Sequence, residues 1–349
     1  MKRKPRILMV APTRGPYGGI EAFTCQIARE VIDSGDFEVR VVFRLRPGCK
    51  IQPTFTEGLK SSGVPWRVMR RPDRKYLADL LWADAIHCHF PLLYATLPAR
   101  VLRKPLVITV ENRFIPAEHK AAHRSGLMTA RARWYISSFV AETWEGTRLQ
   151  PGSRIVPAVS ELPWRWKEPS ERKGFFFIAR WVPLKGIEEL VEAYATAEID
   201  HASHRLALFG DGPLREEIET RIQQLGIGGF IDRAGFVDHE TKAERMASSL
   251  WNVAPAAFEE DLGLSPIEAR SCGVPSIVTR IGGLPEAAGN HSLLCEPGDV
   301  TSLRQALENA VGISPPDYAE LANASKESLK GYLPHPGFYA EEFGKILRA

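Results

Sequence analysis

The 349-residue sequence lacks a long apolar run, a paired-cysteine motif and an internal repeat. The apolar stretch 7–11 ends at Pro12, too early for a membrane span or the core of a signal peptide, and it is better interpreted as a buried strand. No CxxC pair is present, so the sequence predicts no zinc knuckle and no disulfide framework. This pattern favours a reducing compartment. The five cysteines are scattered, at Cys25, Cys49, Cys88, Cys272 and Cys295.

Charge is unevenly distributed along the chain. Residues 1–170 contain 28 Lys and Arg against 15 Asp and Glu, a net charge of +13, whereas the remainder contains 17 against 27, a net charge of −10. The basic half indicates an anionic partner, such as a phosphorylated acceptor or a membrane surface, with an ordinary charged, solvated surface as the simpler alternative. Nucleic acid is not expected, because no dense basic run is interleaved with aromatic residues.

Predicted strands and helices alternate twice along the chain. The first series has strands at 6–10, 39–45, 85–89 and 106–110 and helices at 20–34, 75–82 and 92–102. The second has strands at 175–179, 206–209, 231–236, 250–254 and 274–279 and helices at 186–197, 214–225 and 239–248. This alternation is typical of βαβ units and parallel sheets. We therefore expect an α/β protein with two doubly wound, Rossmann-like domains facing across a ligand cleft.

The domain boundaries follow from composition. The stretch 156–174 is rich in Pro and polar residues and is typical of a linker. We expect an N-terminal acceptor-binding domain at 1–160, a C-terminal donor-binding domain at 161–330, and a terminal segment at 331–349. The last segment contains a predicted helix at 337–347, which we expect to pack back toward the first domain.

Two glutamates eight positions apart, Glu260 and Glu268, raise the central question about function. One interpretation is structural: Ser265 caps a helix, Pro266 occupies its first position, and Glu268 completes a capping box. On that interpretation Glu260 is a solvated loop acid. The other interpretation is that both carboxylates face one ligand.

Four glycine-containing stretches follow predicted strands. They are RGPYGGIEAF with Gly18 and Gly19, IARWVPLKGI with Arg180 and Lys185, FGDGPLREE with Gly210, and RIGGLPEAA. Glycine lets backbone amides approach a phosphate, and Arg with Lys can hold a diphosphate, although each stretch alone could be an ordinary turn or a pair of solvated cations. FGDGPLREE is no dinucleotide fingerprint, because Arg215 replaces the third glycine. A parallel sheet gathers such loops at one edge, which would suit a nucleotide-sugar.

With these motifs in order, the sequence resembles the GT-B fold retaining glycosyltransferases of family 4 (glycosyltransferase group 1). The matching pieces are GGIE, IARWVPLKG, LFGDGP, the Glu-x7-Glu pair, EARSCGVPSIVT and GGLPE, and the similarity is greatest from 175 to 286. The resemblance implies a transferase that moves a sugar from a nucleotide-diphosphate sugar to an acceptor hydroxyl, with retention of configuration. The uneven distribution of charge suggests a role in polysaccharide, lipopolysaccharide or glycolipid synthesis.

The resemblance also implies residue roles. Arg180 and Lys185 would neutralise the departing diphosphate, and Glu260 would contact the transferred sugar. Glu268 would bind the ribose. The remaining donor-binding residues would be Gly18, Gly19, Gly210, Asp261, Leu262, Gly263 and Leu264. No Asp-x-Asp stands at a suitable strand end, so we expect metal-independent chemistry with no cofactor beyond the donor itself.

Two departures from the family pattern concern the sugar and acceptor sites. Asp261-Leu262-Gly263 stands where members often have Gly-Phe-Gly, and Glu111 stands where many have a histidine. Glu111 is an acceptor-side candidate, with a loop acid or a salt bridge to Arg113 as the alternative. His87 and His89 lie at alternate positions of one strand and so share a face. They are acceptor-side candidates too, with hydrogen-bonded structural histidines as the alternative and no acidic residue nearby to complete a metal site.

We therefore expect a cytoplasmic glycosyltransferase with an anionic or lipid-linked acceptor and peripheral membrane contact through its basic N-terminal domain. The alternatives are a sugar-nucleotide epimerase or phosphorylase on the same fold, or a non-catalytic protein that binds nucleotide-sugars. The sugar, base, acceptor and oligomeric state do not follow from the sequence.

Overall fold

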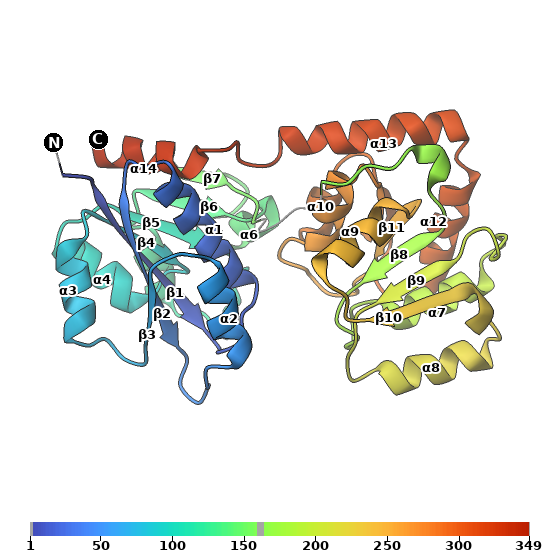
Figure 1. Ribbon diagram of the computed structural model, residues 1–349, viewed down its shortest axis with the longest axis horizontal. Helices are drawn as coiled ribbons and strands as arrows, with labels where there is room; N and C mark the ends of the chain where they lie inside the picture. Colours follow the sequence, from blue (N-terminus) through green and yellow to red (C-terminus); the bar gives the residue numbers. More distant parts are fainter. Residues whose placement is uncertain (1–2, 159–163, 349) are drawn as a thin grey trace. The chain divides into compact units, whose positions relative to one another are not determined.

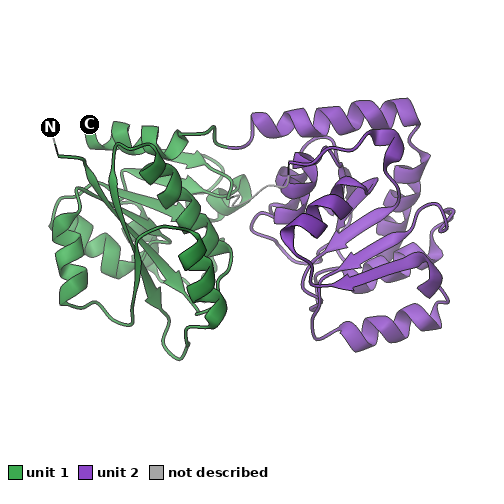
Figure 2. Cartoon of the chain, in the orientation of Figure 1, with its two compact units in different colours: residues 1–160, 334–349 green, residues 161–333 purple. Residues whose placement is uncertain are grey.

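The computed structural model describes residues 3–158 and 164–348 and divides the chain into two compact units (Figure 2). Unit 1 comprises Met1–Ser160 and Pro334–Ala349, and unit 2 comprises Glu161–Leu333. Each unit contains one entirely parallel sheet flanked by helices (Figure 1). The prediction of two doubly wound α/β sheets is therefore confirmed.

The sheet of unit 1 has seven strands in the order β3-β2-β1-β4-β5-β6-β7. Its strands are β1 (Arg6–Thr13), β2 (Glu38–Leu45), β3 (Trp66–Met69), β4 (Ala85–His89), β5 (Leu106–Val110), β6 (Ala132–Tyr135) and β7 (Ser153–Ile155). The central strand β1 is fully buried from Ile7 to Ala11, as its unbroken apolar run predicts for a strand covered on both faces. The strand order reverses between β1 and β4, the position where open α/β sheets bind ligands.

The helices of unit 1 lie on opposite faces because the order of strands reverses. They are α1 (Gly19–Asp33), α2 (Pro53–Ser61), α3 (Arg74–Trp82), α4 (Leu93–Val101), α5 (Ala121–Leu127), α6 (Ser138–Glu145) and α14 (Phe338–Arg348). Right-handed crossovers place α1 and α2 on one face of the sheet and α3, α4, α5 and α6 on the other (Figure 1). Helix α14 covers the first face, where the backbone N–H of Tyr339 donates to Glu30 at 3.0 Å and its ring contacts Phe23.

Unit 2 repeats this plan with six strands in the order β10-β9-β8-β11-β12-β13. Its strands are β8 (Phe175–Ile178), β9 (Leu206–Phe209), β10 (Ile231–Gly235), β11 (Trp251–Ala254), β12 (Ser276–Thr279) and β13 (Leu293–Cys295). Its helices are α7 (Ile187–Thr196), α8 (Arg215–Gln224), α9 (His239–Ala247), α10 (Leu264–Ser271), α11 (Leu284–Ala288), α12 (Val300–Gly312) and α13 (Pro315–Lys330), with short 3₁₀ turns at Pro169–Glu171 and Gly228–Phe230. The order reverses between β8 and β11.

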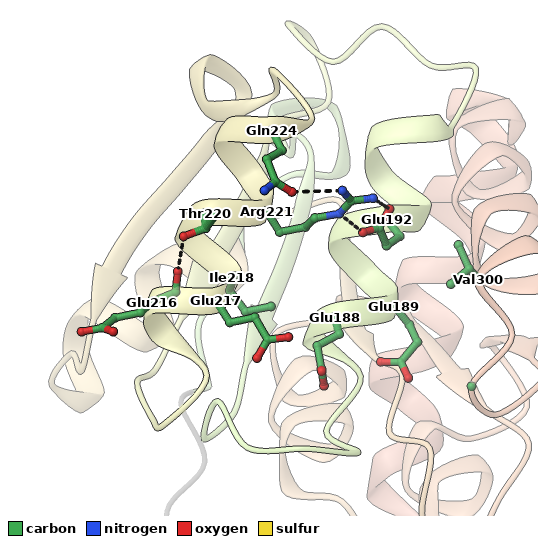
Figure 3. Close-up of a pocket in the computed structure, with 11 residues that line it drawn as sticks. Glu188, Glu189, Glu192, Glu216, Glu217, Ile218, Thr220, Arg221, Gln224 and Val300 are labelled. Carbon is green, nitrogen blue, oxygen red and sulfur yellow. Dashed lines mark hydrogen bonds and ion pairs between the residues drawn. The ribbon is translucent and has the colours of Figure 1, made fainter.

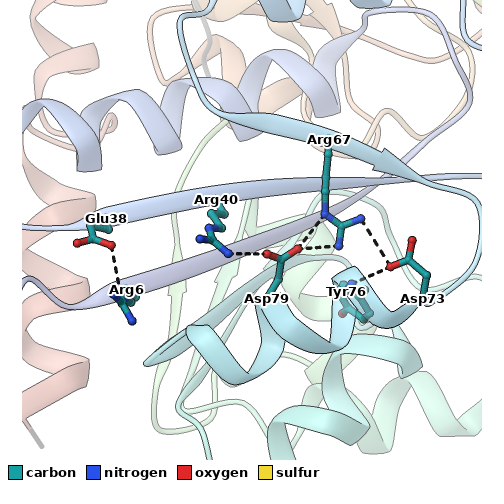
Figure 4. A network of polar contacts seen from close by, with 7 residues as sticks. All are labelled: Arg6, Glu38, Arg40, Arg67, Asp73, Tyr76 and Asp79. Carbon is teal, nitrogen blue, oxygen red and sulfur yellow. Dashed lines mark hydrogen bonds and ion pairs between the residues drawn. The ribbon is translucent and has the colours of Figure 1, made fainter.

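An ion-pair network fixes α3 against the sheet of unit 1 (Figure 4). Asp79, on the buried face of α3, accepts two bonds from Arg67 of β3, at 2.8 and 2.6 Å, and one from Arg40 of β2 at 2.9 Å. The side chain of Asp79 is 9% exposed, so losing either arginine would remove part of the compensation of a poorly solvated charge. The network therefore determines which face of α3 points outward.

A proline inside α4 joins that helix to α3. Pro98 has no N–H, so the carbonyl of Tyr94, four residues earlier, has no donor within the helix. The hydroxyl of Tyr76 on α3 donates to this carbonyl at 3.0 Å. The two helices are thereby held side by side. Among the described residues, none of the helices is both long and apolar enough to cross a bilayer.

We predict that Tyr76→Phe lowers the free energy of unfolding by about 1–3 kcal/mol, because it leaves the partly buried Tyr94 carbonyl without this donor. Urea denaturation of the purified protein would measure this. Tyr339→Phe is the matched control, because the buried Tyr339 hydroxyl finds no partner among the described residues. Equal losses in the two variants would contradict the prediction.

Candidate functional site

Four loops meet at the carboxyl edge of the unit 2 sheet. The N–H of Ala257 donates to Leu184 at 2.8 Å, which joins the loop after β11 to the loop after β8. The N–H of Trp181 donates to Asp211 at 2.9 Å and that of Gly283 to Glu260 at 2.7 Å, which add the loops after β9 and β12. The structure thus brings the glycine-containing stretches of unit 2 together at the point where strand order reverses.

These loops approach so closely that only glycine fits at three contacts. A Cβ on Gly186 would lie 2.0 Å from the carbonyl oxygen of Pro255, and one on Gly210 would lie 1.9 Å from that of Ala179. At Gly282 the corresponding distance to the Glu260 oxygen is 2.5 Å, and all three glycines have positive φ. Gly210 therefore has a packing role that is sufficient to explain it.

The cation of Lys185 and the carboxylate of Glu260 form a direct ion pair across the reversal point. Lys185 follows β8 and Glu260 follows β11, and each side chain is about one-fifth exposed. The ammonium also lies 4.9 Å from the ring centroid of Phe258. Arg180, at the start of the same loop, is exposed and makes no ion pair with another described residue. One accessible cation and one paired cation therefore lie in this loop.

The carboxylate of Glu268 pairs with Lys242 of α9, a residue that the sequence analysis did not identify. Helix α10 begins at Leu264 after Gly263 rather than at a Ser265 cap, and the side chain of Glu268 extends to Lys242. The capping-box interpretation is therefore wrong. Nothing in the sequence links Lys242 to Glu268, because their proximity depends on the packing of α9 beside α10.

The start of α10 leaves the backbone N–H groups of Leu264 and Ser265 without a side-chain cap. Its first flanking residue, Gly263, has φ +97°, and no side chain caps the helix. Asp261 and Leu262 precede it, with Leu262 buried and Leu264 exposed. The first amides of a helix carry partial positive charge and suit an anion. Such an end beside Lys185 has the chemistry to hold a phosphate.

Backbone strain marks both reversal points. Leu184, next to Lys185, has φ +68°, and Phe90, directly after β4 in unit 1, has φ +76°. Side chains other than glycine rarely adopt this conformation, and it is retained where the surrounding structure requires it. In unit 2 the carbonyl of Leu184 accepts a hydrogen bond from the N–H of Ala257. The unusual conformation of Leu184 therefore fixes the loop that contains Arg180 and Lys185 against the loop after β11.

The carboxyl edge of unit 1 contains a second set of candidates. Glu21 accepts from the N–H of Gly18 at 3.1 Å, and burial raises the pKa of this carboxyl group. A Cβ on Gly19 would meet nothing within 4 Å, so the space beside it is open. The glycines therefore leave room for a ligand at the start of α1.

The two histidines of β4 have different surroundings. His89 Nδ1 lies 2.6 Å from Glu111 Oε1, and its ring contacts Phe23. His87 Nε2 lies 2.8 Å from the hydroxyl of Thr109, and its ring packs against Trp134. Both imidazoles are fully buried, whereas about one-tenth of the Glu111 side chain is exposed. Only Glu111 of these acceptor-side candidates therefore reaches the surface.

A separate pocket of about 700 Å³ lies between α7 and α8 (Figure 3). Its wall contains five glutamates, Glu188, Glu189, Glu192, Glu216 and Glu217. Only Glu192 is paired there, with Arg221. This negative charge would repel a diphosphate, so the pocket is a poor donor site. Within the described residues no cluster of three His, Cys, Asp or Glu side chains could hold a metal ion.

Comparison with known proteins places these loops in a recognised segment. Residues 159–328 match the family Glycosyl transferases group 1. A 2-deoxystreptamine N-acetyl-D-glucosaminyltransferase of Streptomyces fradiae is 28% identical over 331 residues, which are 82% of this chain and 75% of that protein. An exopolysaccharide phosphotransferase of Streptomyces coelicolor is 33% identical over 164 residues, 46% of this chain but only 17% of that protein.

The fold is shared over the whole chain with solved structures. The Anabaena protein HepE, in complex with UDP and glucose, matches with a TM-score of 0.74 and 16% identity, covering 99% of both chains. At this identity the likeness establishes the fold alone.

We predict that His87 makes the protein less stable in acid. Burial, followed by the neighbouring His89, holds the pKa of His87 well below its usual value. Below about pH 6.5 the His87 side chain therefore binds a proton in the unfolded chain but not in the folded chain. The free energy of unfolding then falls as pH decreases, by at most about 1.4 kcal/mol per pH unit. In His87→Gln the fall in unfolding free energy between about pH 7.5 and pH 5 should be smaller, as measured in urea. His239→Gln, at an exposed position, is the control and should behave as the wild type does.

Proposed function

We propose that this chain, whose residues 159–328 match the family Glycosyl transferases group 1, transfers a sugar from a nucleotide-diphosphate sugar to an acceptor hydroxyl, with retention of configuration. The observation that carries the proposal is the Lys185–Glu260 ion pair at the reversal point of the unit 2 sheet. It combines a cation suited to the diphosphate with a carboxylate suited to sugar hydroxyls.

The leaving group would be stabilised by fixed positive charge. Arg180 supplies an accessible guanidinium fork, Lys185 supplies a point charge, and the first amides of α10 add partial charges. Such groups, already in position, stabilise charge that develops as the bond to the sugar breaks. This arrangement supports metal-independent chemistry with no cofactor besides the donor.

The carboxylates would bind hydroxyl groups once the donor arrives. In the ligand-free state Lys185 and Lys242 compensate Glu260 and Glu268. A diphosphate would attract Lys185, which leaves Glu260 able to accept from the transferred sugar. Glu268, still held by Lys242, would accept from the ribose. The lysines thus prevent the two acids from repelling the donor.

The donor would be a UDP-sugar, since a protein of the same fold was solved with UDP and glucose. The acceptor would bind at unit 1, where Glu111 is partly exposed beside His89. An anionic or lipid-linked acceptor suits the net positive charge of residues 1–170. Polysaccharide or glycolipid synthesis and a cytoplasmic location remain predictions.

We predict that Lys185→Ala lowers the rate of sugar transfer about 10²–10³-fold, because a charge at the leaving diphosphate is lost. Its free energy of unfolding should change by less than about 1 kcal/mol, since the ion pair is partly solvated. Release of nucleoside diphosphate would report the rate. Lys173→Ala, which removes an exposed lysine elsewhere in unit 2, should retain activity. Near-normal turnover of Lys185→Ala would refute the diphosphate role.

Thermal unfolding with UDP-, GDP-, ADP- and dTDP-sugars would identify the donor. A ligand at about 100 times its dissociation constant stabilises the folded protein by about 2.7 kcal/mol. We predict the largest shift with a UDP-sugar, and a smaller shift in Glu268→Gln, which weakens the bond to the ribose. Absence of a shift with every nucleotide would overturn the donor assignment, and product analysis would separate transfer from epimerisation and phosphorolysis.

A further inference from the structure

Helices α3 and α4 of unit 1 expose apolar side chains at regular spacing. On α4 the stripe is Leu93, Leu97 and Val101, and on α3 it is Leu77 and Leu81. Spacing of four residues places each set on one face of its helix. Leu81, Leu97 and Val101 are 60%, 62% and 71% exposed, respectively, which is unusual for aliphatic side chains of a folded protein at neighbouring positions.

The two stripes form one surface. At one end the Tyr76 hydroxyl of α3 donates to Tyr94 of α4. At the other end the Lys104 ammonium, just beyond α4, donates to the carbonyls of Leu81 and Ala83. The helices therefore lie side by side along their length. We name this surface, formed by Leu77, Leu81, Leu93, Leu97 and Val101, the α3–α4 surface.

The α3–α4 surface continues onto α5. A Cβ on Gly126 would lie 3.0 Å from the hydroxyl oxygen of Thr96 on α4, so the two helices are in close contact. Met128, at the end of α5, is about half exposed and adds a flexible apolar side chain. It also lines a groove of about 550 Å³ together with Phe114 and Pro116. The apolar region thus covers the outer side of one helical layer.

Cations surround the α3–α4 surface. Arg74 lies three residues before Leu77, and Arg100 three residues after Leu97, so each shares a face with the apolar stripe. The segment 70–104 has seven cationic residues: Arg70, Arg71, Arg74, Lys75, Arg100, Arg103 and Lys104. Within the described chain, none of the five arginines takes part in an ion pair, nor does Lys75.

The acidic residues of the same segment do not offset this charge. Asp73 caps α3 by accepting from the N–H of Tyr76 at 2.7 Å. Asp79 faces the sheet and is paired with Arg40 and Arg67. Asp84 is paired with Arg3, which holds the pKa of the aspartate below its usual value. The three aspartates, which are all the acidic residues of 70–104, are therefore engaged elsewhere.

We propose that the α3–α4 surface docks on an anionic lipid bilayer, with its leucines inserted between headgroups and its cations on the phosphates. Apolar side chains at the centre and cations at the edge are the composition of interfacial membrane-binding surfaces. A second copy of the chain fits less well, because a two-fold contact through this surface would bring like-charged rims together.

The position of the surface relates it to the acceptor edge. Because helices of βαβ units run antiparallel to the strands, Leu77 and Leu93, early in their helices, lie toward the carboxyl edge of the sheet. Glu111 and Gly19 lie at the same edge. By the same rule Leu81 and Val101, at the ends of these helices, lie toward the opposite edge, so docking along α3 and α4 would place both edges beside the bilayer, the acceptor edge included. A lipid-linked acceptor is found there. This consequence rests on the proposed function, whereas docking itself does not.

Co-sedimentation with vesicles tests the proposal without any transfer reaction. The protein should bind vesicles of phosphatidylcholine with an equal amount of phosphatidylglycerol at low salt, and bind phosphatidylcholine alone about tenfold or more weakly. Added salt should reduce binding, because it screens the attraction. Failure of the wild type to bind the anionic vesicles would overturn the proposal and leave the transfer assay unaffected.

Two paired substitutions locate the surface. Leu97→Gln with Val101→Gln should weaken binding about tenfold or more, since the apolar insertion is lost. Its control, Ile51→Gln with Leu149→Gln, removes exposed apolar residues elsewhere in unit 1 and should bind normally. Arg74→Gln with Arg100→Gln should weaken binding at low salt to a similar degree, whereas Lys60→Gln with Arg148→Gln should not.

Circular dichroism would confirm that each variant is folded. We expect them to fold, because the replaced side chains are exposed. Folded surface variants that bind as well as their controls would refute the proposed location. Sedimentation velocity tests whether a second copy of the chain occupies the surface instead. A wild-type dimer that dissociates in Leu97→Gln with Val101→Gln, together with absence of vesicle binding, would assign the surface to self-association and overturn the proposal.

Discussion

Close backbone approach at the carboxyl edge of the unit 2 sheet is the constraint on which the candidate site depends. Gly186 and Gly282 let the loop after β11 contact the loops after β8 and β12. A side chain at either position would push the loops apart and separate Lys185 from Glu260. The positive φ of Leu184 belongs to the same constraint, because its carbonyl accepts the bond that joins two of these loops.

Electrostatic compensation follows from that packing. Two carboxylates beside a diphosphate would be unfavourable unless cations offset them, and Lys185 and Lys242 do so from two different elements. Among the described residues that line the acidic pocket between α7 and α8, Arg221 is the single cation.

In unit 1 the buried polar side chains contribute to packing, and the outer sides of helices α3 and α4 are exposed. His87 is fully buried against Trp134 and Phe343, so it contributes to the core, while the neighbouring His89 supports Glu111. On the other face, Asp79 and the proline of α4 fix two helices whose remaining sides are apolar and basic. The contacts that orient the polar sides of α3 and α4 toward the protein therefore leave their leucines exposed on the outer side.

The sequence by itself determined the parallel α/β plan, because long apolar strands such as β1 and periodic helices such as α1 are properties of local pattern. It missed short or polar elements, among them β3, β7 and α13, whose formation depends on neighbours. It identified Arg180, Lys185, Glu260 and Glu268 through their place after strands. Only tertiary structure decided that Glu268 pairs with Lys242 rather than capping α10, and that the leucines of α3 and α4 share one surface, because both depend on contacts between segments that no local pattern records.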